Sequence, residues 1–203
     1  MTTKEAGPRR PRISDYAAVE AAARLHLCSV AEAPGVRARH VAALLAFTSS
    51  VTRTPSRMSI HLQHGPSAYW LVQALAHPNV ELVDVSGEGG TVTVTNPQMV
   101  LGRYGFRDGQ WVFGHGPEAT MGICRGAVHS AVRFNGHGMK VACPSPAKML
   151  TLTAVMSRLG IKAKPTDGEP RAAVGPADVS HALDRIGIAP VGAQYLAAVG
   201  GRS

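Results

Sequence analysis

The residues best able to do chemistry in this chain are its histidines and cysteines. His115, His129 and His137 flank glycine-rich turns, a setting that could suggest a zinc or HNH-like nuclease site, but their spacing matches no ligand motif. The cysteines are odd in number and widely spaced, so they build neither a disulfide framework nor a zinc site. They are Cys28, Cys124 and Cys143. Cys143 lies on an apolar segment, which favours a core thiol over a nucleophile. We therefore assign no catalytic residue, no metal and no cofactor.

Basic side chains form the second group of candidates. The formal net charge is +8, which favours an acidic partner, and nucleic acid is the commonest one. Lysine and arginine are frequent on the strands expected in the second half of the chain. The candidates for phosphate contacts in DNA are Arg57, Arg133, Lys140, Lys162, Lys164 and Arg171. For each of them a solvated surface charge is the alternative.

Length and composition restrict the class of protein. With 203 residues, of which 45% are apolar, the chain is long enough for one compact domain, with or without tails. It has no run of about 18 apolar residues, so we expect no membrane span. The Arg-Pro cluster near the start is not followed by an apolar segment, which argues against a secretory signal. A cytoplasmic location is expected, with the nucleoid as the site of action if the protein binds DNA.

Two stretches of the chain repeat one order of elements, residues 40–106 and residues 125–188. Each has a small apolar run (42–47 and 126–131), an alternating strand (58–62 and 139–143), an apolar helix (67–76 and 147–159) and a strand that ends before a proline (91–96 and 171–175). The matched prolines are 80 residues apart for Pro66 and Pro146 (146 − 66) and 79 for Pro97 and Pro176 (176 − 97). Two copies are too few for a solenoid, so they predict one pseudo-twofold domain. Chance similarity of two helix–strand segments is the alternative.

The expected architecture is α+β, with two pseudo-symmetric αββα(β)α repeats whose strands form a curved sheet with helices behind it. We divide the chain into a disordered basic arm (1–13), a first repeat (14–110), a linker (111–122), a second repeat (123–198) and a tail (199–203). The linker is rich in glycine, so little regular structure is expected in it. Because the repeat supplies both halves of a pseudo-dimer, we expect a monomer.

Three segments carry a resemblance to a known family. The segment Lys140-Val141-Ala142-Cys143-Pro144-Ser145-Pro146, with residues 152–164 after it, looks like the second LAGLIDADG-like repeat of the WhiA family. Cys124-Arg125-Gly126-Ala127 resembles the Arg-Gly-Ala-Phe signature of that family, and residues 41–47 resemble its Ala-Ala-Leu-Leu-Arg-Phe helix. The resemblance covers roughly residues 36–198. It implies a LAGLIDADG homing-endonuclease-like fold.

WhiA proteins are regulators of sporulation and cell division in Gram-positive bacteria. They join a degenerate homing-endonuclease domain to a C-terminal helix-turn-helix, and this chain stops where that second domain would begin. The resemblance therefore implies a DNA-binding role in transcription regulation, but it does not imply autonomous recognition of a promoter.

The resemblance also bears on catalysis. In homing endonucleases of this fold, an acidic residue ends each of two central helices, and the pair holds divalent metal at the scissile phosphates. The matching positions here are Thr48, Ser49 and Ser50 in the first repeat and Ser130, Ala131 and Val132 in the second. Neutral hydroxyls bind Mg²⁺ far too weakly to replace carboxylates. We therefore expect that the chain is not an enzyme.

Two functions remain in competition. The first is a catalytically inactive DNA-binding module of low sequence specificity, a WhiA-like regulator whose sheet face lies along a groove of DNA. The second is a protein-interaction module that modulates a full-length WhiA-type regulator without binding DNA itself. Tyr104, Trp111 and Phe113 could form such a protein contact if they are exposed rather than packed within the fold. Clustering of the basic residues on the sheet face would favour the first function.

Overall fold

The computed structural model describes residues 13–200, with the backbone alone at residues 13 and 14. The expected basic arm therefore lies outside the described residues, apart from Ile13 at the start of the first helix. Of the expected tail, residues 199 and 200 belong to the last helix, and the others lie outside the described part.

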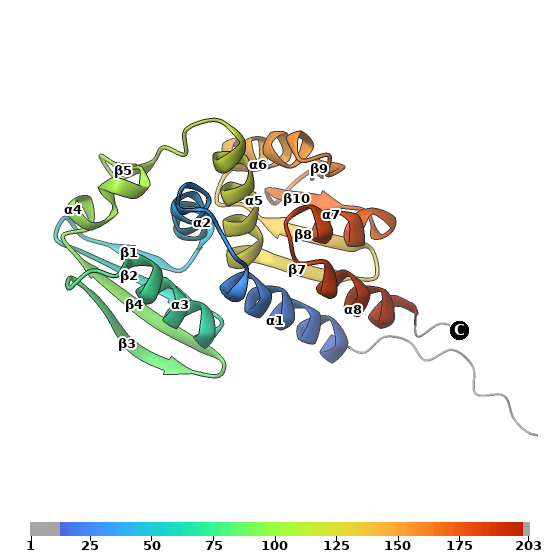
Figure 1. Ribbon diagram of the computed structural model, residues 1–203, viewed down its shortest axis with the longest axis horizontal. Helices are drawn as coiled ribbons and strands as arrows, with labels where there is room; N and C mark the ends of the chain where they lie inside the picture. The colour runs from blue at the N-terminus through green and yellow to red at the C-terminus, as the bar shows by residue number, and fades with distance from the viewer. Residues whose placement is uncertain (1–12, 201–203) are drawn as a thin grey trace, which may run out of the picture.

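The first half of the molecule is a four-stranded antiparallel sheet with helices on one side (Figure 1). Its strands are ordered β1-β2-β4-β3. In chain order this half consists of α2 (Pro34–Phe47), β1 (Val51–Arg53), β2 (Arg57–Leu62), α3 (Gly65–Leu75), β3 (Val80–Ser86), β4 (Gly89–Thr95), α4 (Pro97–Leu101) and the 3-10 turn η1 (Gly102–Tyr104). A two-stranded hairpin follows it, formed by β5 (Phe106–Arg107) and β6 (Gln110–Trp111).

The second half repeats this topology, because its strands are ordered β7-β8-β10-β9. It consists of α5 (Pro117–Ala131), β7 (Val132–Asn135), β8 (Gly138–Ala142), α6 (Pro146–Arg158), β9 (Ala163–Pro165), β10 (Arg171–Val174), the 3-10 turn η2 (Pro176–Asp178) and α7 (Val179–Arg185). The internal repeat is thereby confirmed. The matched prolines stand in the first turns of matched helices, where the absent N–H of proline costs no hydrogen bond.

Two expectations need correction. The segment 111–122 was expected to be irregular, but α5 already begins at Pro117, and Gly122 lies within this helix. The curved sheet region consists of two separate four-stranded sheets, one in each half. The first half adds one edge strand that was not predicted, and the second half adds two. The unpredicted strands β1, β7 and β9 have only three or four residues, which is too short for an alternating pattern to stand out.

Two glycines set the distance between the halves. Gly122 and Gly126 of α5 face α2, and a Cβ atom built at Gly126 would lie 2.4 Å from the carbonyl oxygen of His40. At Gly122 the corresponding distance to the carbonyl oxygen of Val36 is 2.5 Å. Only glycine allows two helix backbones to approach so closely. As a result α2 and α5 lie side by side at the centre of the molecule, one from each half (Figure 1).

Each half has its own hydrophobic core. Leu45, Ile60 and Leu71 belong to the core of the first half, whereas Val141 and Leu152 belong to that of the second. The helices α1 (Ile13–Ser29) and α8 (Ala189–Gly200) pack against each other and extend the second core (Figure 1). None of the helices that the structure describes is long and apolar enough to cross a membrane.

Candidate nucleic-acid interface

A groove of about 310 Å³ opens where α2 and α5 end. The two helices converge there, so that the Thr48 Oγ1 and Ser130 Oγ atoms lie 3.0 Å apart. Thr48 and Ser130 are among the positions that the family resemblance matched to the ends of the two central helices. Thr48 Oγ1 also donates to the carbonyl oxygen of Leu44 at 2.8 Å, so Ser130 is the donor in the bond between the two hydroxyls. Val132, the third position considered in the second half, lies in the core as the first residue of β7.

One wall of the groove is formed by the outer face of the second sheet. Along β7 and β8, apolar side chains point to the core and polar ones point outward, as the period of two requires. Arg133, Lys140 and Arg171 line the groove from three adjacent strands. Among the described residues, the lining of the groove includes these three cations and no carboxylate.

The strand registers place a fourth cation on the same outer face. Lys140 of β8 pairs with Ala173 of β10, and Ala173 in turn pairs with Lys164 of β9. Directly paired residues of antiparallel strands lie on one face of a sheet. Lys164 therefore lies on the same face as Lys140, beyond the groove.

The outer face of the first sheet has a different chemistry. Arg57, Ser59 and His61 of β2 pair with three threonines of β4, and the acidic Glu81 and Asp84 lie on the neighbouring strand β3. The threonines are Thr95, Thr93 and Thr91. Thr93 is buried, so the first sheet presents the hydroxyl groups of Ser59, Thr91 and Thr95, with Arg57 at one end of β2 and the two carboxylates on β3.

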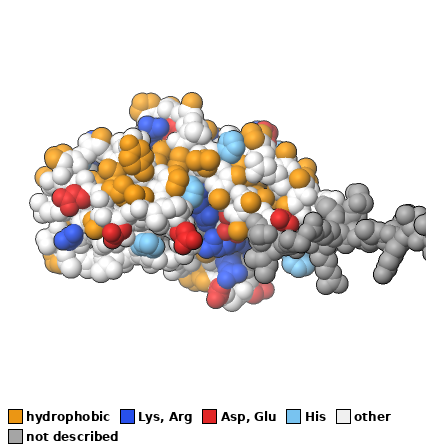
Figure 2. All heavy atoms as spheres, turned by 90° about the horizontal axis from the view of Figure 1, so that it is seen from below, with side chains coloured by type: hydrophobic (Ala, Val, Ile, Leu, Met, Phe, Trp, Pro, Cys, Tyr) orange, Lys and Arg blue, Asp and Glu red, His pale blue; other side chains and the backbone are white. Residues whose placement is uncertain are grey.

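The predicted phosphate contacts are thus distributed unequally. Four of the six side chains, Arg133, Lys140, Lys164 and Arg171, share the outer face of the second sheet, and Arg57 lies on that of the first. Lys162 precedes β9, and its Nζ atom forms an ion pair with Asp178 of η2 at 3.3 Å. Figure 2 shows a group of Lys and Arg side chains near the middle of the face seen from below, with acidic side chains beside it and others scattered to its left.

Arg133 connects the second sheet to two other elements. Its Nη1 atom donates to Glu20 of α1 at 2.6 Å, and its Nη2 atom donates to Gln63, just after β2, at 2.7 Å. Its side chain remains 56% exposed. Arg171 pairs with the exposed Glu169. These contacts hold the two guanidinium groups in place while leaving donors directed to solvent.

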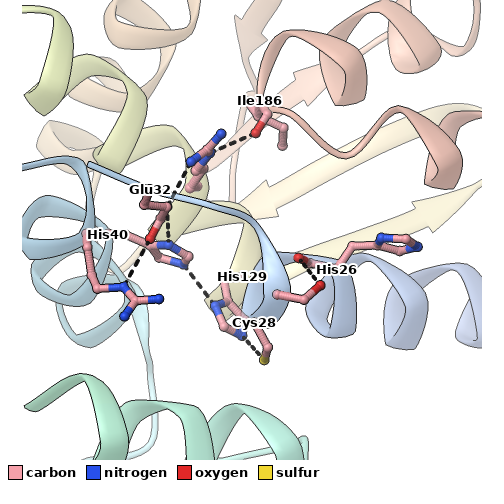
Figure 3. Close-up of polar contacts among 9 residues, drawn as sticks. His26, Cys28, Glu32, His40, His129 and Ile186 are labelled. Atoms are coloured by element: carbon pink, nitrogen blue, oxygen red, sulfur yellow. Dashed lines mark hydrogen bonds and ion pairs between the residues drawn. The ribbon is translucent and has the colours of Figure 1, made fainter. Parts of the chain in front are cut away.

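A buried polar network behind the groove was not predicted (Figure 3). His40 of α2 receives a hydrogen bond from His129 of α5 through its Nε2 atom at 2.9 Å and donates from Nδ1 to Glu32 at 2.9 Å. His129 Nε2 accepts from the Ser67 hydroxyl at 2.8 Å, and Ser67 in turn accepts from His64 Nδ1 at 2.8 Å. This assignment of protons follows from the Glu32 carboxylate, which can only accept.

Burial keeps the two central histidines neutral. Burial lowers the pKa of His40, and it lowers that of His129 more strongly. The electrostatic influence of His40, Arg24 and His64 further lowers the pKa of His129. For Glu32, burial acts to raise the pKa, but the hydrogen bonds from His40 and Arg125 and the positive charge of Arg125 outweigh it, and the pKa is lowered. The network therefore consists of one carboxylate and neutral imidazoles, and it ties α2, α3 and α5 together.

The histidines and cysteines give no sign of a metal centre. His129 is buried, while His115 and His137 lie in exposed turns, so the three do not meet. In residues 13–200 no group of three or more His, Cys, Asp or Glu side chains could hold a metal ion. Burial raises the pKa of Cys143 to about 11 and that of Cys124 to about 12, so both thiols stay protonated. Cys143 is buried, as expected.

Comparisons with known proteins identify the fold. No protein-family model and no curated protein matches the chain. Full-length DUF199/WhiA from Thermatoga maritima superposes with a TM-score of 0.63 at 12% identity, over 89% of this chain and 66% of that one. The N-terminal LAGLIDADG domain of DUF199/WhiA gives 0.62 at 10% identity, over 89% and 93%. The complex of I-DmoI with DNA and Mn gives 0.55 at 9% identity, over 75% and 96%. The chain therefore has the α+β LAGLIDADG-like fold that the resemblance implied.

Proposed function

We propose that this chain is a catalytically inactive DNA-binding module that contacts the phosphate backbone mainly through its second sheet. The observation that carries the proposal is the alignment of Arg133, Lys140, Lys164 and Arg171 on one outer face. Cations on one exposed face contact successive phosphates, and such contacts supply affinity with little sequence preference. The hydroxyl-rich face of the first sheet would lie along the neighbouring stretch of the duplex.

The absence of cleavage is part of the proposal. Thr48 and Ser130 lie at the convergence of the two central helices, and neither has a carboxylate. A nuclease that works through Mg²⁺ needs hard, charged oxygen ligands at the metal. A pair of neutral hydroxyls does not provide them, so we expect binding without hydrolysis.

The finer biological role rests on the WhiA structures. Their fold matches over most of this chain, whereas I-DmoI matches over less of it. On this basis we propose a WhiA-like regulatory role in transcription, with sporulation and cell division as the processes to examine. In this role the chain would supply non-specific affinity for DNA.

The alternative function is a protein-interaction module, and the aromatic residues suggested for its contact surface pack within the fold. The Tyr104 side chain is 6% exposed, and its hydroxyl donates to the carbonyl oxygen of Ala74 at 3.0 Å. Trp111 packs on Phe106, and Phe113 stacks on Phe47. These aromatic rings are parts of the fold, so DNA binding is the function that the surface favours.

The test is a fluorescence anisotropy titration of a random-sequence duplex over a series of salt concentrations. We expect log K to fall linearly with log salt, with a slope of about −0.9 for each phosphate contact. The substitution Lys164→Ala should flatten that slope by about 0.9 and weaken binding to all sequences alike.

Lys162→Ala provides the matched control. It removes the same charge two residues away, but from a side chain that precedes β9 and is paired with Asp178 of η2. Its slope should equal that of the unmodified protein. If the unmodified protein does not bind the duplex even at about 50 mM salt, the proposal is wrong.

A further inference from the structure

Two like charges face each other across the strands β7 and β8. Arg133 and Lys140 are direct cross-strand partners on the outer face of the second sheet. Like charges in this position destabilise a sheet. Glu20 compensates the charge of Arg133, and Gln63 accepts a hydrogen bond from it, but no described residue forms a hydrogen bond or ion pair with the Lys140 ammonium. A half-buried, uncompensated lysine beside an arginine has a cost for the fold that a bound anion would remove.

The surroundings define where such an anion would lie. The C-terminal ends of α2 and α5 bring partial negative charge to the floor of the groove, about −0.5 for each helix. That charge favours cationic groups over an anion at the floor itself. The anion site is therefore at the wall, between the Arg133 guanidinium and the Lys140 ammonium, with the hydroxyl of Ser130 at its edge.

The neighbouring carboxylates do not fill this position. Asp167 and Glu169 line a second hollow that also borders Lys140, yet neither forms an ion pair with it. Glu169 is instead bonded to Arg171. The Lys140 ammonium thus keeps its positive charge at the wall of the groove, beside the Arg133 guanidinium, whose charge Glu20 offsets.

We infer that Arg133 and Lys140 form a binding site for a single phosphate group, which they hold without a divalent metal ion. The inference rests on the proposed function, because the backbone of DNA is the phosphate source that the groove would meet. Free phosphate has the same chemistry at this site, so the experiment has to separate the two sources.

The decisive variant is Lys140→Glu. It replaces a repelling pair by an attracting one, so we expect the Tm of the protein to rise by a degree or more. Affinity for a duplex should fall at least about tenfold, because a contact is lost and a negative charge faces the phosphates. If Lys140 instead stabilises the fold, Lys140→Glu should lower the Tm. A Tm that falls while DNA affinity is unchanged would therefore overturn the inference.

The anisotropy titration is repeated with EDTA and with Mg²⁺ at matched ionic strength, with Lys162→Ala as the control variant. The affinity of the unmodified protein should agree within about twofold in the two buffers, whereas Lys140→Ala should flatten the salt slope by about 0.9. Binding that requires Mg²⁺, or a Lys140→Ala slope equal to that of the unmodified protein, would refute the phosphate site and leave DNA binding standing.

Inorganic phosphate, followed by NMR shifts of the backbone amides of residues 133 and 140, separates the remaining outcomes. If DNA does not bind but phosphate shifts these amides in the unmodified protein and not in Lys140→Glu, the proposed function fails and the site survives as one for free phosphate. If neither ligand has an effect, both the site and the proposed function are wrong.

Discussion

The side-chain oxygens of Thr48 and Ser130 lie 3.0 Å apart at the point where α2 and α5 end. Each comes from one half of the molecule, so the pair marks the pseudo-twofold axis. Its chemistry is neutral, and the nearest cations lie on the wall of the same groove. Whether the groove can bind a divalent metal ion depends on this pair, and the first prediction concerns substitutions at both positions.

The double substitution Thr48→Asp with Ser130→Asp should create a metal-responsive protein. Two carboxylates this close repel each other, so the Tm should fall in EDTA, and Mg²⁺ or Ca²⁺ should restore it by supplying a shared cation. Thermal unfolding with and without metal checks this. The conservative pair Thr48→Ser with Ser130→Thr should behave like the unmodified protein, whose Tm we expect metal not to move.

The unmodified protein should not nick supercoiled plasmid in the presence of Mg²⁺, because the described residues that line the groove include no carboxylate to hold the ion. An agarose gel assay over several hours tests this expectation. Nicking that disappears in a Ser49→Ala variant would show that the hydroxyls of the groove do catalyse hydrolysis.

Gly126→Ala should destabilise the protein by about 1–3 kcal/mol, because the added methyl group meets the backbone of α2, which cannot move aside without separating the helices. Urea unfolding measures the difference. Gly102→Ala is the control, since a Cβ atom at Gly102 has nothing within 4 Å and the backbone there is helical. We expect that change to be neutral or slightly stabilising.

Stability should decrease as the pH falls below about 6.5, the ordinary pKa of histidine. The pKa values of His40 and His129 are lowered in the folded protein, so below that pH the unfolded chain binds more protons than the folded one. Each of the two histidines can add a slope of up to about 1.36 kcal/mol per pH unit. Urea unfolding between about pH 5 and pH 8 follows this loss, with His115→Gln, in an exposed turn, as the control variant.

Glu32→Ala should cost about 3–5 kcal/mol, because it leaves the buried Arg125 guanidinium without its ionic partner and the His40 Nδ1–H without an acceptor. The exposed Glu169→Ala also removes a partner of an arginine, but it should change stability by at most about 1 kcal/mol. Comparing the two variants by urea unfolding tests whether the Glu32 network holds the halves together. Equal losses for both would contradict this role.

Much of the fold could be predicted because the pattern behind it is local. The alternation of Met58, Ile60 and Leu62 with polar residues defines β2, and the prolines at 66, 97, 146 and 176 mark helix starts in both halves. The start of α5 was missed because Gly122 follows Gly114 and Gly116, and this density of glycine resembles a linker. Gly122 and Gly126 serve instead to bring α5 against α2, a contact between residues more than 80 positions apart that no local pattern records.

The sequence by itself determined the order of elements in the two repeats, the prolines at the helix starts, and the basic side chains on strands of alternating polarity. Each of these features depends on residues that are close together in the chain. Only the tertiary structure decided which lysines belong to the proposed DNA-binding face. Lys140 and Lys162 have the same chemistry, yet Lys140 is paired with Arg133 on the neighbouring strand, whereas Lys162 forms an ion pair with Asp178. It likewise decided that Glu32, His40, His129 and Ser67, distant along the chain, share one buried network. Strand register and helix packing set these distances, and both arise only when separate segments meet.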